Sequence, residues 1–351
     1  AFLVALLIVS VAGHAQLYEP PARTSIGLKV GTPNCAGGSC LWFIDGSFIG
    51  CGKARGSMIP GLRPKDCNST APIIPRNDKV RGTVFTTLDD VDPEFRPVVL
   101  SFPHLDWTMY HPWRRPGNAP VEDSCGLNGG WYKAGRVGTG GNASFSQSQG
   151  TKGTTMPPLL KQTTWVAGSS VEVAFGLTAN HGGGYQYRLC RVKDPTSIKE
   201  EATEECFQKL PVEFVGTKQW IQWGDGMDVN NRTEINATRV LDEKGKIWTK
   251  IPIPGCSDIP RLGGHNHVCR KPMFDPPLPG LFGFGPGACA SADPKAPPCT
   301  SAEMKQRGMP FGIVDKLNVP NVTPGTYILS WRWDCEQLPQ VWFGCADVTI
   351  K

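Results

Sequence analysis

The chain has 351 residues, of which 40% are hydrophobic and only 19% are charged. Its net charge of +5 is spread along the sequence without a dense cluster of lysine and arginine, so the composition does not indicate nucleic-acid binding. The 41 glycines and 32 prolines argue against long helices and favour short strands joined by many loops.

The first segment, residues 1–13, is uncharged, apolar and ends in small residues. This pattern is typical of the apolar part of a secretory signal peptide, here truncated because the initiating methionine and the basic segment are missing. Cleavage after Gly13 makes His14 the first residue of the mature protein, whereas cleavage after Ala15 removes it. No second apolar run is long enough to span a membrane, so we expect a secreted, extracellular protein without a membrane partner.

Thirteen cysteines in an exported chain predict a disulfide framework, and the odd number leaves one cysteine over. A zinc site is the competing interpretation, but the sequence contains no CxxC pair. Spacing alone does not determine the pairing, although Cys335 and Cys345 are placed to close the terminal hairpin. Glycosylation is expected at five sequons, which are at Asn68, Asn142, Asn231, Asn236 and Asn321.

Three segments alternate as strands with one buried face, and a short helix is predicted over 197–209. The residues expected on the buried faces are Val171, Val173, Phe175 and Leu177 in 171–179, Tyr327, Leu329, Trp331 and Trp333 in 326–335, and Trp342, Ala346, Val348 and Ile350 in 342–350. Heptads and fixed-period repeats are absent from the sequence. The pattern favours an all-β fold, an immunoglobulin- or fibronectin-III-like antiparallel β-sandwich.

No linker divides the sequence, so we expect a single domain over 14–351. Two long irregular stretches, near 52–125 and near 193–320, are predicted to be insertions into this domain. Their richness in proline, glycine and cysteine favours loops held by disulfides.

Two histidines are candidates for one metal site. An N-terminal His14 offers its α-amine and its imidazole to the same ion. His181 follows the 171–179 strand and precedes three glycines, which predict a sharp turn and an accessible ring. The alternative for His181 is a loop histidine that is hydrogen-bonded to the backbone.

The segments HAQLYEPPAR, ANHGGGYQYRLC and WRWDCEQLPQVWFGCADVTI together resemble the lytic polysaccharide monooxygenases, in particular the chitin-binding type-4 group and auxiliary activity family 15. The resemblance implies a copper "histidine brace". His14 then provides the α-amine and a ring nitrogen, and His181 provides a second ring nitrogen. The spacing between the motifs is longer than in compact members of the family, as expected for a core that carries two insertions.

By the same resemblance, Ala179 and Trp342 line the two axial positions, and Gln340 is the polar residue that hydrogen-bonds the oxygen species beside the copper. Trp342 departs from the family pattern, in which the axial aromatic residue is usually Tyr or Phe, and it cannot act as a phenol ligand. Phe343 is the alternative if the register shifts by one residue, and a plain core position for Trp342 is equally open. For Gln340 the alternative is a solvated turn residue.

The chemistry of the proposed ligands favours copper independently of the family. Nitrogen ligands suit copper, and an α-amine with a pKa of about 8 is readily deprotonated for binding. Three protein nitrogens leave positions open for O₂ or H₂O₂. The resemblance therefore implies a monomeric copper monooxygenase that takes electrons from an external donor and oxidises C1 or C4 of a crystalline polysaccharide, chitin first and cellulose second.

Two other functions remain open at this point. One is a non-catalytic chitin-binding or lectin-like protein, which would keep the sandwich without requiring His14. The other is a copper-binding protein that has the brace but no polysaccharide target. A glycosidase has little support, because adjacent carboxylates such as Asp89 and Asp90 are typical of solvated surface.

Two further histidine pairs were weighed as sites. His265 and His267 form an H-x-H pair, a weak metal signal that a disulfide-bonded loop explains better. His104 and His111 flank or lie in the aromatic segment DWTMYHPWRR, which predicts either stacking on sugar rings or a packing role for tryptophans such as Trp113.

Overall fold

The computed structural model of the protein describes residues 14–24, 42–47, 49, 111–130, 148–160, 162–223, 227–255, 274–279, 281, 311–336 and 340–351. The predictions for the leader 1–13, for most of the first insertion, for part of the second, and for His104, His265 and His267 lie outside these residues. The sequons at Asn68 and Asn142 also lie outside them, whereas Asn231, Asn236 and Asn321 are exposed.

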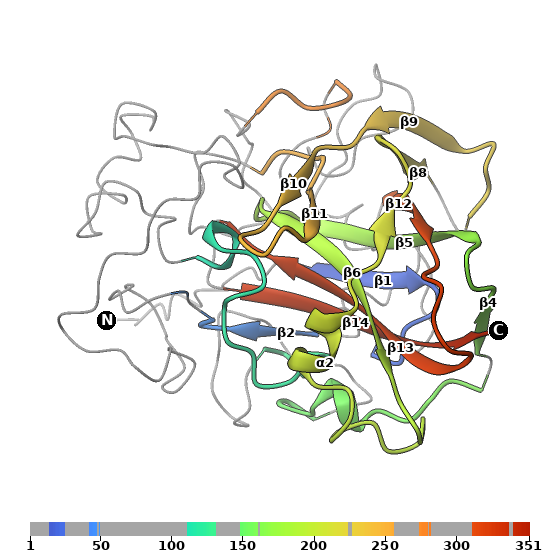
Figure 1. Cartoon of the computed structure of the whole chain (residues 1–351). Helices are drawn as coiled ribbons and strands as arrows, with labels where there is room; N and C mark the ends of the chain where they lie inside the picture. Colours follow the sequence, from blue (N-terminus) through green and yellow to red (C-terminus); the bar gives the residue numbers. More distant parts are fainter. Residues whose placement is uncertain are drawn as a thin grey trace, which may run out of the picture.

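Two β-sheets make up the described part of the chain (Figure 1). The first sheet has the strand order β1 (His14–Glu19), β5 (Ser170–Ala179), β12 (Phe311–Asn318), β8 (Lys218–Trp223) and β9 (Arg232–Asn236), with β7 (Glu213–Phe214) also paired to β12. The second has the order β10 (Arg239–Leu241), β11 (Ile247–Lys250), β6 (Gly184–Arg191), β13 (Gly325–Asp334), β14 (Gln340–Ile350), β2 (Trp42–Asp45) and β3 (Leu127–Asn128), with β4 (Thr163–Trp165) beside β14. The helical elements are α2 (Glu204–Lys209) and the 3₁₀ turns η3 (Pro112–Arg114) and η4 (Gly153–Thr155).

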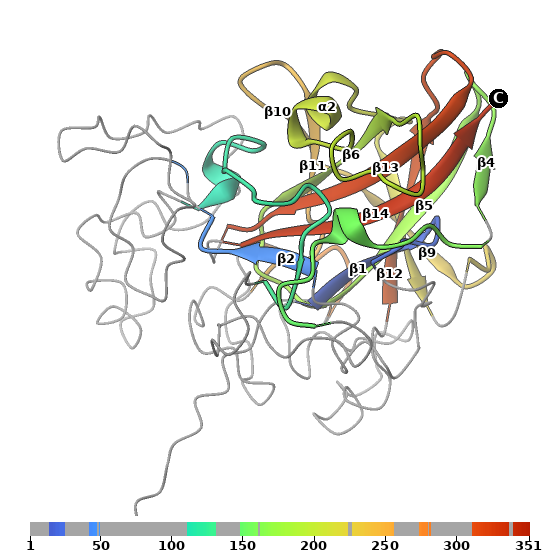
Figure 2. The ribbon, with the colours of Figure 1, turned by 90° about the horizontal axis from the view of Figure 1, so that it is seen from below.

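The predicted antiparallel β-sandwich is confirmed. Figure 2 shows β13 and β14 running side by side in one layer, with β1 and β12 in the other. Among the described strands, the pair β4–β14 is parallel, and it places the C-terminus beside β4 (Figure 1). We call the two layers the β5 sheet and the β13 sheet, after a strand in each.

The core lies between the two sheets and contains the three apolar faces predicted from the alternation. Phe175 of β5 packs against Trp331 of β13 with ring centroids 4.7 Å apart, and all the other predicted face residues except Val171 are buried in the same cluster. Val171 is partly buried at its margin. Because successive side chains on a strand point to opposite faces, burial of one face fixed the alternation that the sequence displays.

The predicted helix is shorter than expected, because α2 begins only after Thr203. The Thr203 hydroxyl accepts a hydrogen bond from the Cys206 N–H at 3.2 Å, and Thr203 itself has an extended backbone, so it is the N-cap. Upstream, the Thr196 N–H donates to the Asp194 carboxylate, which holds that segment in a turn. In the described part of the chain, no helix is both long and apolar enough to cross a membrane.

Two disulfides are present in the described residues, and they correct the expected pairing. Cys345 is bonded to Cys125, not to Cys335, and Cys190 is bonded to Cys206. Cys335 is a buried free thiol. The pairing with Cys125 lies 220 residues away in sequence, which a hairpin-based expectation does not reach.

The two ends of the described chain are joined by a buried ion pair. The Arg23 guanidinium donates to both carboxylate oxygens of Asp347, with the Nε–Oδ2 distance at 2.9 Å. Arg23 also donates to the carbonyls of Met156 and Pro195. The first and last of the three sequence motifs are therefore in contact through these two residues.

Candidate metal centre

The first strand begins beside the end of β5, and this register brings the two candidate ligands together along the backbone. In the antiparallel ladder, His14 of β1 is paired with Ala179 of β5. Paired residues in such a ladder have Cα atoms about 5 Å apart, and one residue adds about 3.3 Å along a strand. His181 follows Ala179 by two residues, so the backbone positions of the two histidines lie at the same corner of the sandwich.

The turn that carries His181 is held by its neighbour Asn180. The Asn180 side chain accepts a hydrogen bond from the Gly182 N–H at 2.9 Å and donates to the Ile253 carbonyl. The His181 carbonyl accepts from the Glu336 N–H at 3.2 Å. These bonds tie the turn to segments on both of its sides.

The glycines after His181 do not make the ring accessible, although the sequence predicted that they would. The His181 side chain is only 3% exposed, so the turn does not leave the ring open to solvent. Gly183 has φ of +84°, and a Cβ there would lie 2.1 Å from the carbonyl oxygen of Asp334. The glycine therefore permits close packing of the turn against the end of β13.

Aromatic rings extend from His181 into the core. The Trp333 ring lies nearly parallel to the His181 ring at 6.4 Å, and its indole N–H donates to the Gly182 carbonyl at 2.8 Å. Trp342 is the cross-strand neighbour of Trp333, with ring centroids 6.0 Å apart. Trp342 also stacks on Phe43 at 4.3 Å. Trp333 thus links His181 with Trp342.

Trp342 and its alternative Phe343 point to opposite faces of the β13 sheet. Trp342 is fully buried in the core between the sheets, on the face that carries Trp333. Phe343 packs in a separate cluster with Ile44 and Val341 on the outer face. Only Trp342 therefore shares a face with the ring that stacks on His181, and its burial is also that of a core tryptophan.

Gln340 begins β14 on the same inner face as Trp342. Its side chain is fully buried, which excludes the solvated turn residue weighed for it. Its Oε1 accepts from the Trp342 indole N–H at 3.2 Å, and its Nε2 has no hydrogen-bond acceptor among the described residues. A buried amide nitrogen without an acceptor is costly, so it marks a position where a ligand or water would be accommodated favourably.

The segment around Cys335 closes the corner from the other side. The Trp113 N–H donates to the Cys335 carbonyl, and His111 Nδ1 lies 2.7 Å from the Glu336 carbonyl oxygen. Burial raises the pKa of the Cys335 thiol well above its usual value, so the thiol stays protonated. Trp113 is fully buried against Trp248, which decides for packing over sugar stacking at this tryptophan.

Sequence reasoning missed two residues of this corner. Asn180 was not singled out, although an Asn beside a glycine-rich turn is a familiar turn-forming signal. Trp333 was assigned only to the core face, and its contact with His181 depends on the pairing of β13 with β6, which a local pattern does not reveal.

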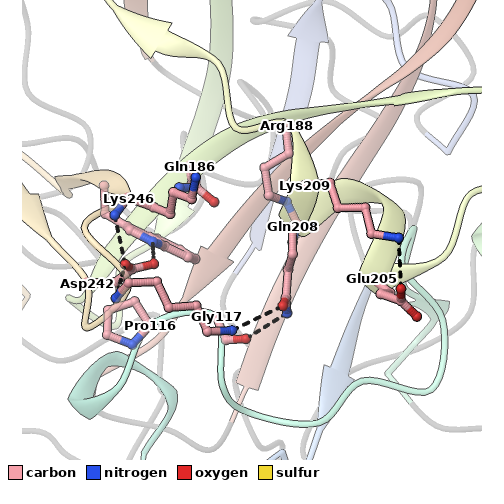
Figure 3. A pocket seen from close by; sticks show the side chains of 11 residues that line it. Pro116, Gly117, Gln186, Arg188, Glu205, Gln208, Lys209, Asp242 and Lys246 are labelled. Atoms are coloured by element: carbon pink, nitrogen blue, oxygen red, sulfur yellow. Dashed lines mark hydrogen bonds and ion pairs between the residues drawn. The ribbon is translucent and has the colours of Figure 1, made fainter.

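A separate hollow lies on the outer face of the β13 sheet, and none of the predicted site residues lines it. Figure 3 shows Gln208 of α2 reaching Gly117 and Lys209 turned toward Glu205. On its other side, Asp242 accepts from the backbone of the β10–β11 turn and from the Trp248 indole N–H. The polar groups that line this hollow are thus largely engaged with one another.

No cluster of three or more His, Cys, Asp or Glu side chains that could hold a metal occurs among the described residues. A comparison of the sequence with protein-family models found no match.

A comparison with solved structures found similarity to the following three, among others. They are a lytic polysaccharide monooxygenase of family AA15 from Thermobia domestica in the Cu(I) state (15% identity, 54% of this chain and 62% of that chain, TM-score 0.24), a chitin-binding domain from Burkholderia pseudomallei (10%, 97% and 100%, TM-score 0.32) and an AA10 lytic polysaccharide monooxygenase from Streptomyces lividans (10%, 60% and 71%, TM-score 0.22). This chain matches only part of the length of such proteins: 62% of the AA15 structure, and 53% and 56% of two other solved chains. At these identities and TM-scores, the functional proposal rests on the residues of this chain.

Proposed function

We propose that the protein is a secreted copper-dependent monooxygenase that oxidises crystalline polysaccharide, chitin in the first place and cellulose in the second. His14 and His181 are the copper ligands in this proposal. The observation that carries it is the register of β1 on β5, which pairs His14 with the residue two before His181. The two candidate ligands are far apart in sequence, and the pairing supports the proposal because it brings their backbone positions to the same corner of the sandwich.

The donor set at this corner fits copper. An N-terminal histidine and a second imidazole provide three nitrogen ligands, which copper prefers over the oxygen ligands that magnesium and calcium require. Gln340 adds a buried amide nitrogen, for which the described part of the chain provides no acceptor. Copper bound there would supply one-electron redox chemistry toward O₂ or H₂O₂.

The chain's own residues would orient the site. Asn180 holds the turn, and the Trp333 ring lies nearly parallel to the His181 ring, with the centroids 6.4 Å apart. Gln340 offers an N–H donor to an oxygen ligand on the inner face of the sheet. Trp342 closes that face behind Gln340, since their side chains are hydrogen-bonded.

The decisive comparison is between two proteins that differ by one residue at the N-terminus. The protein that begins at His14 has a free α-amine on the histidine, whereas the protein that begins at Gly13 has that nitrogen in a peptide bond. We expect calorimetry to show tight Cu²⁺ binding by the first protein and strongly weakened binding by the second. With β-chitin, copper and ascorbate, mass spectrometry should detect oxidised oligosaccharides only from the first.

His181→Ala is the matched ligand variant, and it should lose both copper binding and oxidised products while it still folds. Tight copper binding without an oxidised product from chitin, cellulose or another polysaccharide would indicate a copper-binding protein and overturn the enzyme. Chitin binding that is indifferent to copper would indicate a carbohydrate-binding protein. A mature N-terminus at Gln16 in the secreted protein would remove the brace altogether.

A further inference from the structure

A polar cluster lies buried between the two sheets, apart from the histidine corner. Asp315 of β12 and Gln219 of β8 belong to the β5 sheet, and Tyr185 of β6 belongs to the β13 sheet. All three residues are fully buried. The Tyr185 hydroxyl lies 2.7 Å from Asp315 Oδ2 and 3.0 Å from Gln219 Oε1, so it joins the two sheets through both contacts.

The number of protons in this cluster can be counted from its geometry. Gln219 Nε2 donates to the Asn236 carbonyl at 3.4 Å, which directs Oε1, an acceptor, toward Tyr185. The Tyr185 hydroxyl has one proton, so it can donate to Gln219 Oε1 or to Asp315 Oδ2 but not to both at once. Both contacts are of hydrogen-bond length, and both are hydrogen bonds only when the Asp315 carboxyl supplies a second proton.

The charged group that faces Asp315 in the described structure is Arg239 of β10. Its Nη1 is 3.4 Å from Asp315 Oδ1, a long contact, and the same nitrogen donates to the Thr249 hydroxyl. The guanidinium also lies over the Phe214 ring at 4.1 Å. Arg239 thus has other partners and does not require an ionised carboxylate.

The remaining ionisable neighbours are tyrosines. Burial raises the pKa of Tyr185 and of Tyr187 well above the usual value, so both stay neutral over the range in which a carboxyl group titrates. Asp315 is therefore the group in this cluster that gains or loses a proton in mildly acidic solution.

We propose that Asp315 is a proton-binding site and that its bound proton acts as a latch, which means that it stabilises the contact between the two sheets. With the proton present, Asp315 donates to Tyr185 and Tyr185 donates to Gln219, so both contacts of the Tyr185 hydroxyl are hydrogen bonds. Without it, the single Tyr185 proton serves only one of the two contacts, so the other is left without a hydrogen bond, and a carboxylate is buried between the sheets. Tyr185 is the first core residue after the His181 turn, so the latch holds the strand that leaves that turn. The inference does not depend on copper.

The sign of the effect on stability follows from the direction of the pKa shift. Burial raises the pKa of Asp315 from 3.8 to about 6, and Arg239 and the hydrogen bond from Tyr185 oppose the shift. The folded protein therefore binds this proton more tightly than the unfolded chain does. The stabilising contribution is complete below pH 4 and is lost as the pH rises through about 6, a change of about 100-fold in the unfolding equilibrium constant.

The test compares denaturant unfolding of the wild type and Asp315→Asn from pH 4 to pH 7. Asn keeps a donor for Tyr185 but has no proton to lose. We expect the stability of Asp315→Asn relative to wild type to rise with pH by about 100-fold in the unfolding constant. The infrared difference spectrum of the wild type minus this variant should contain the band of one protonated carboxyl group at pH 5.

Tyr185→Phe removes the hydroxyl between Asp315 and Gln219 and serves as the second variant. The hydrogen bond from Tyr185 lowers the pKa of Asp315, so its removal should shift the pH-dependent loss of stability to higher pH even where the overall stability is lower. The proposal is wrong if the difference in the free energy of unfolding between wild type and Asp315→Asn is constant from pH 4 to pH 7. It is also wrong if the infrared band is missing at pH 5. If Asp315→Asn does not fold, the infrared titration of the wild type and the Tyr185→Phe comparison decide the question.

Discussion

Gly183 occupies a position where no side chain fits. Its backbone has a positive φ, and the carbonyl of Asp334 lies where a Cβ would be. Backbone cannot give way as a flexible side chain does, so the constraint is stronger than the conformational preference alone. At the residue scale, this contact fixes the turn of His181 against the end of β13.

Gly183→Ala should therefore destabilise the protein more than an equivalent change at Gly245. Gly245 also has a positive φ, +72°, but nothing lies within 4 Å of its Cβ position. We expect a loss of about 1 kcal/mol at Gly245 from backbone strain and of about 3 kcal/mol at Gly183, where a steric clash is added. Urea unfolding of both variants measures the difference, and equal losses would show that the contact with Asp334 relaxes at little cost.

At the scale of elements, β14 and β6 of the β13 sheet are each tied by a disulfide to another segment of the chain. The bond between Cys125 and Cys345 joins the η3–β3 region to β14, whereas the bond between Cys190 and Cys206 pins α2 to the end of β6. A disulfide that closes a longer loop restricts the unfolded chain more strongly.

Removal of the long-range disulfide should cost more than removal of the local one. Chain entropy predicts a loss of about 5 kcal/mol for Cys125→Ala with Cys345→Ala and of about 3 kcal/mol for Cys190→Ala with Cys206→Ala. Thermal melts of the two double variants under one set of conditions test the order. A reversed order would indicate that packing around α2, and not loop closure, sets the stability contributed by these bonds.

At the scale of the whole molecule, the fold is closed by Arg23 and Asp347, which are 324 residues apart. Both side chains are almost completely buried. Such a pair contributes little compared with apolar residues of the same shape, but loss of one member leaves a buried charge without its partner.

Asp347→Ala should accordingly lower the free energy of unfolding by about 3 to 5 kcal/mol, as measured in denaturant. Replacement of both members, Arg23→Met with Asp347→Leu, should recover much of that loss because no charge is left buried. Glu205→Ala, which breaks the exposed pair with Lys209, is the control and should change little. A double variant as unstable as the single one would mean that the remaining bonds of Arg23 matter more than the ion pair.

Much of the sandwich was predictable because its information is local. The alternation in 171–179, 326–335 and 342–350 reports which side of each strand is buried, and the structure confirms those faces. The helix was overextended because the cap at Thr203 competes with a continuous helical pattern. The pairing of Cys345 was wrong because hairpin proximity does not reveal a partner that the chain brings from 220 residues away.

From the order of residues alone, one can read the strand faces, the fold class and the two histidines that are candidates for a metal. Tertiary structure decides the rest: that His14 is paired with Ala179, that Trp333 lies against His181, and that Phe343 faces away from that corner. It also places the Tyr185 hydroxyl between Asp315 and Gln219, which come from different strands. The physical reason is that side-chain alternation is a property of one strand, whereas register and burial depend on which distant strands pack against it.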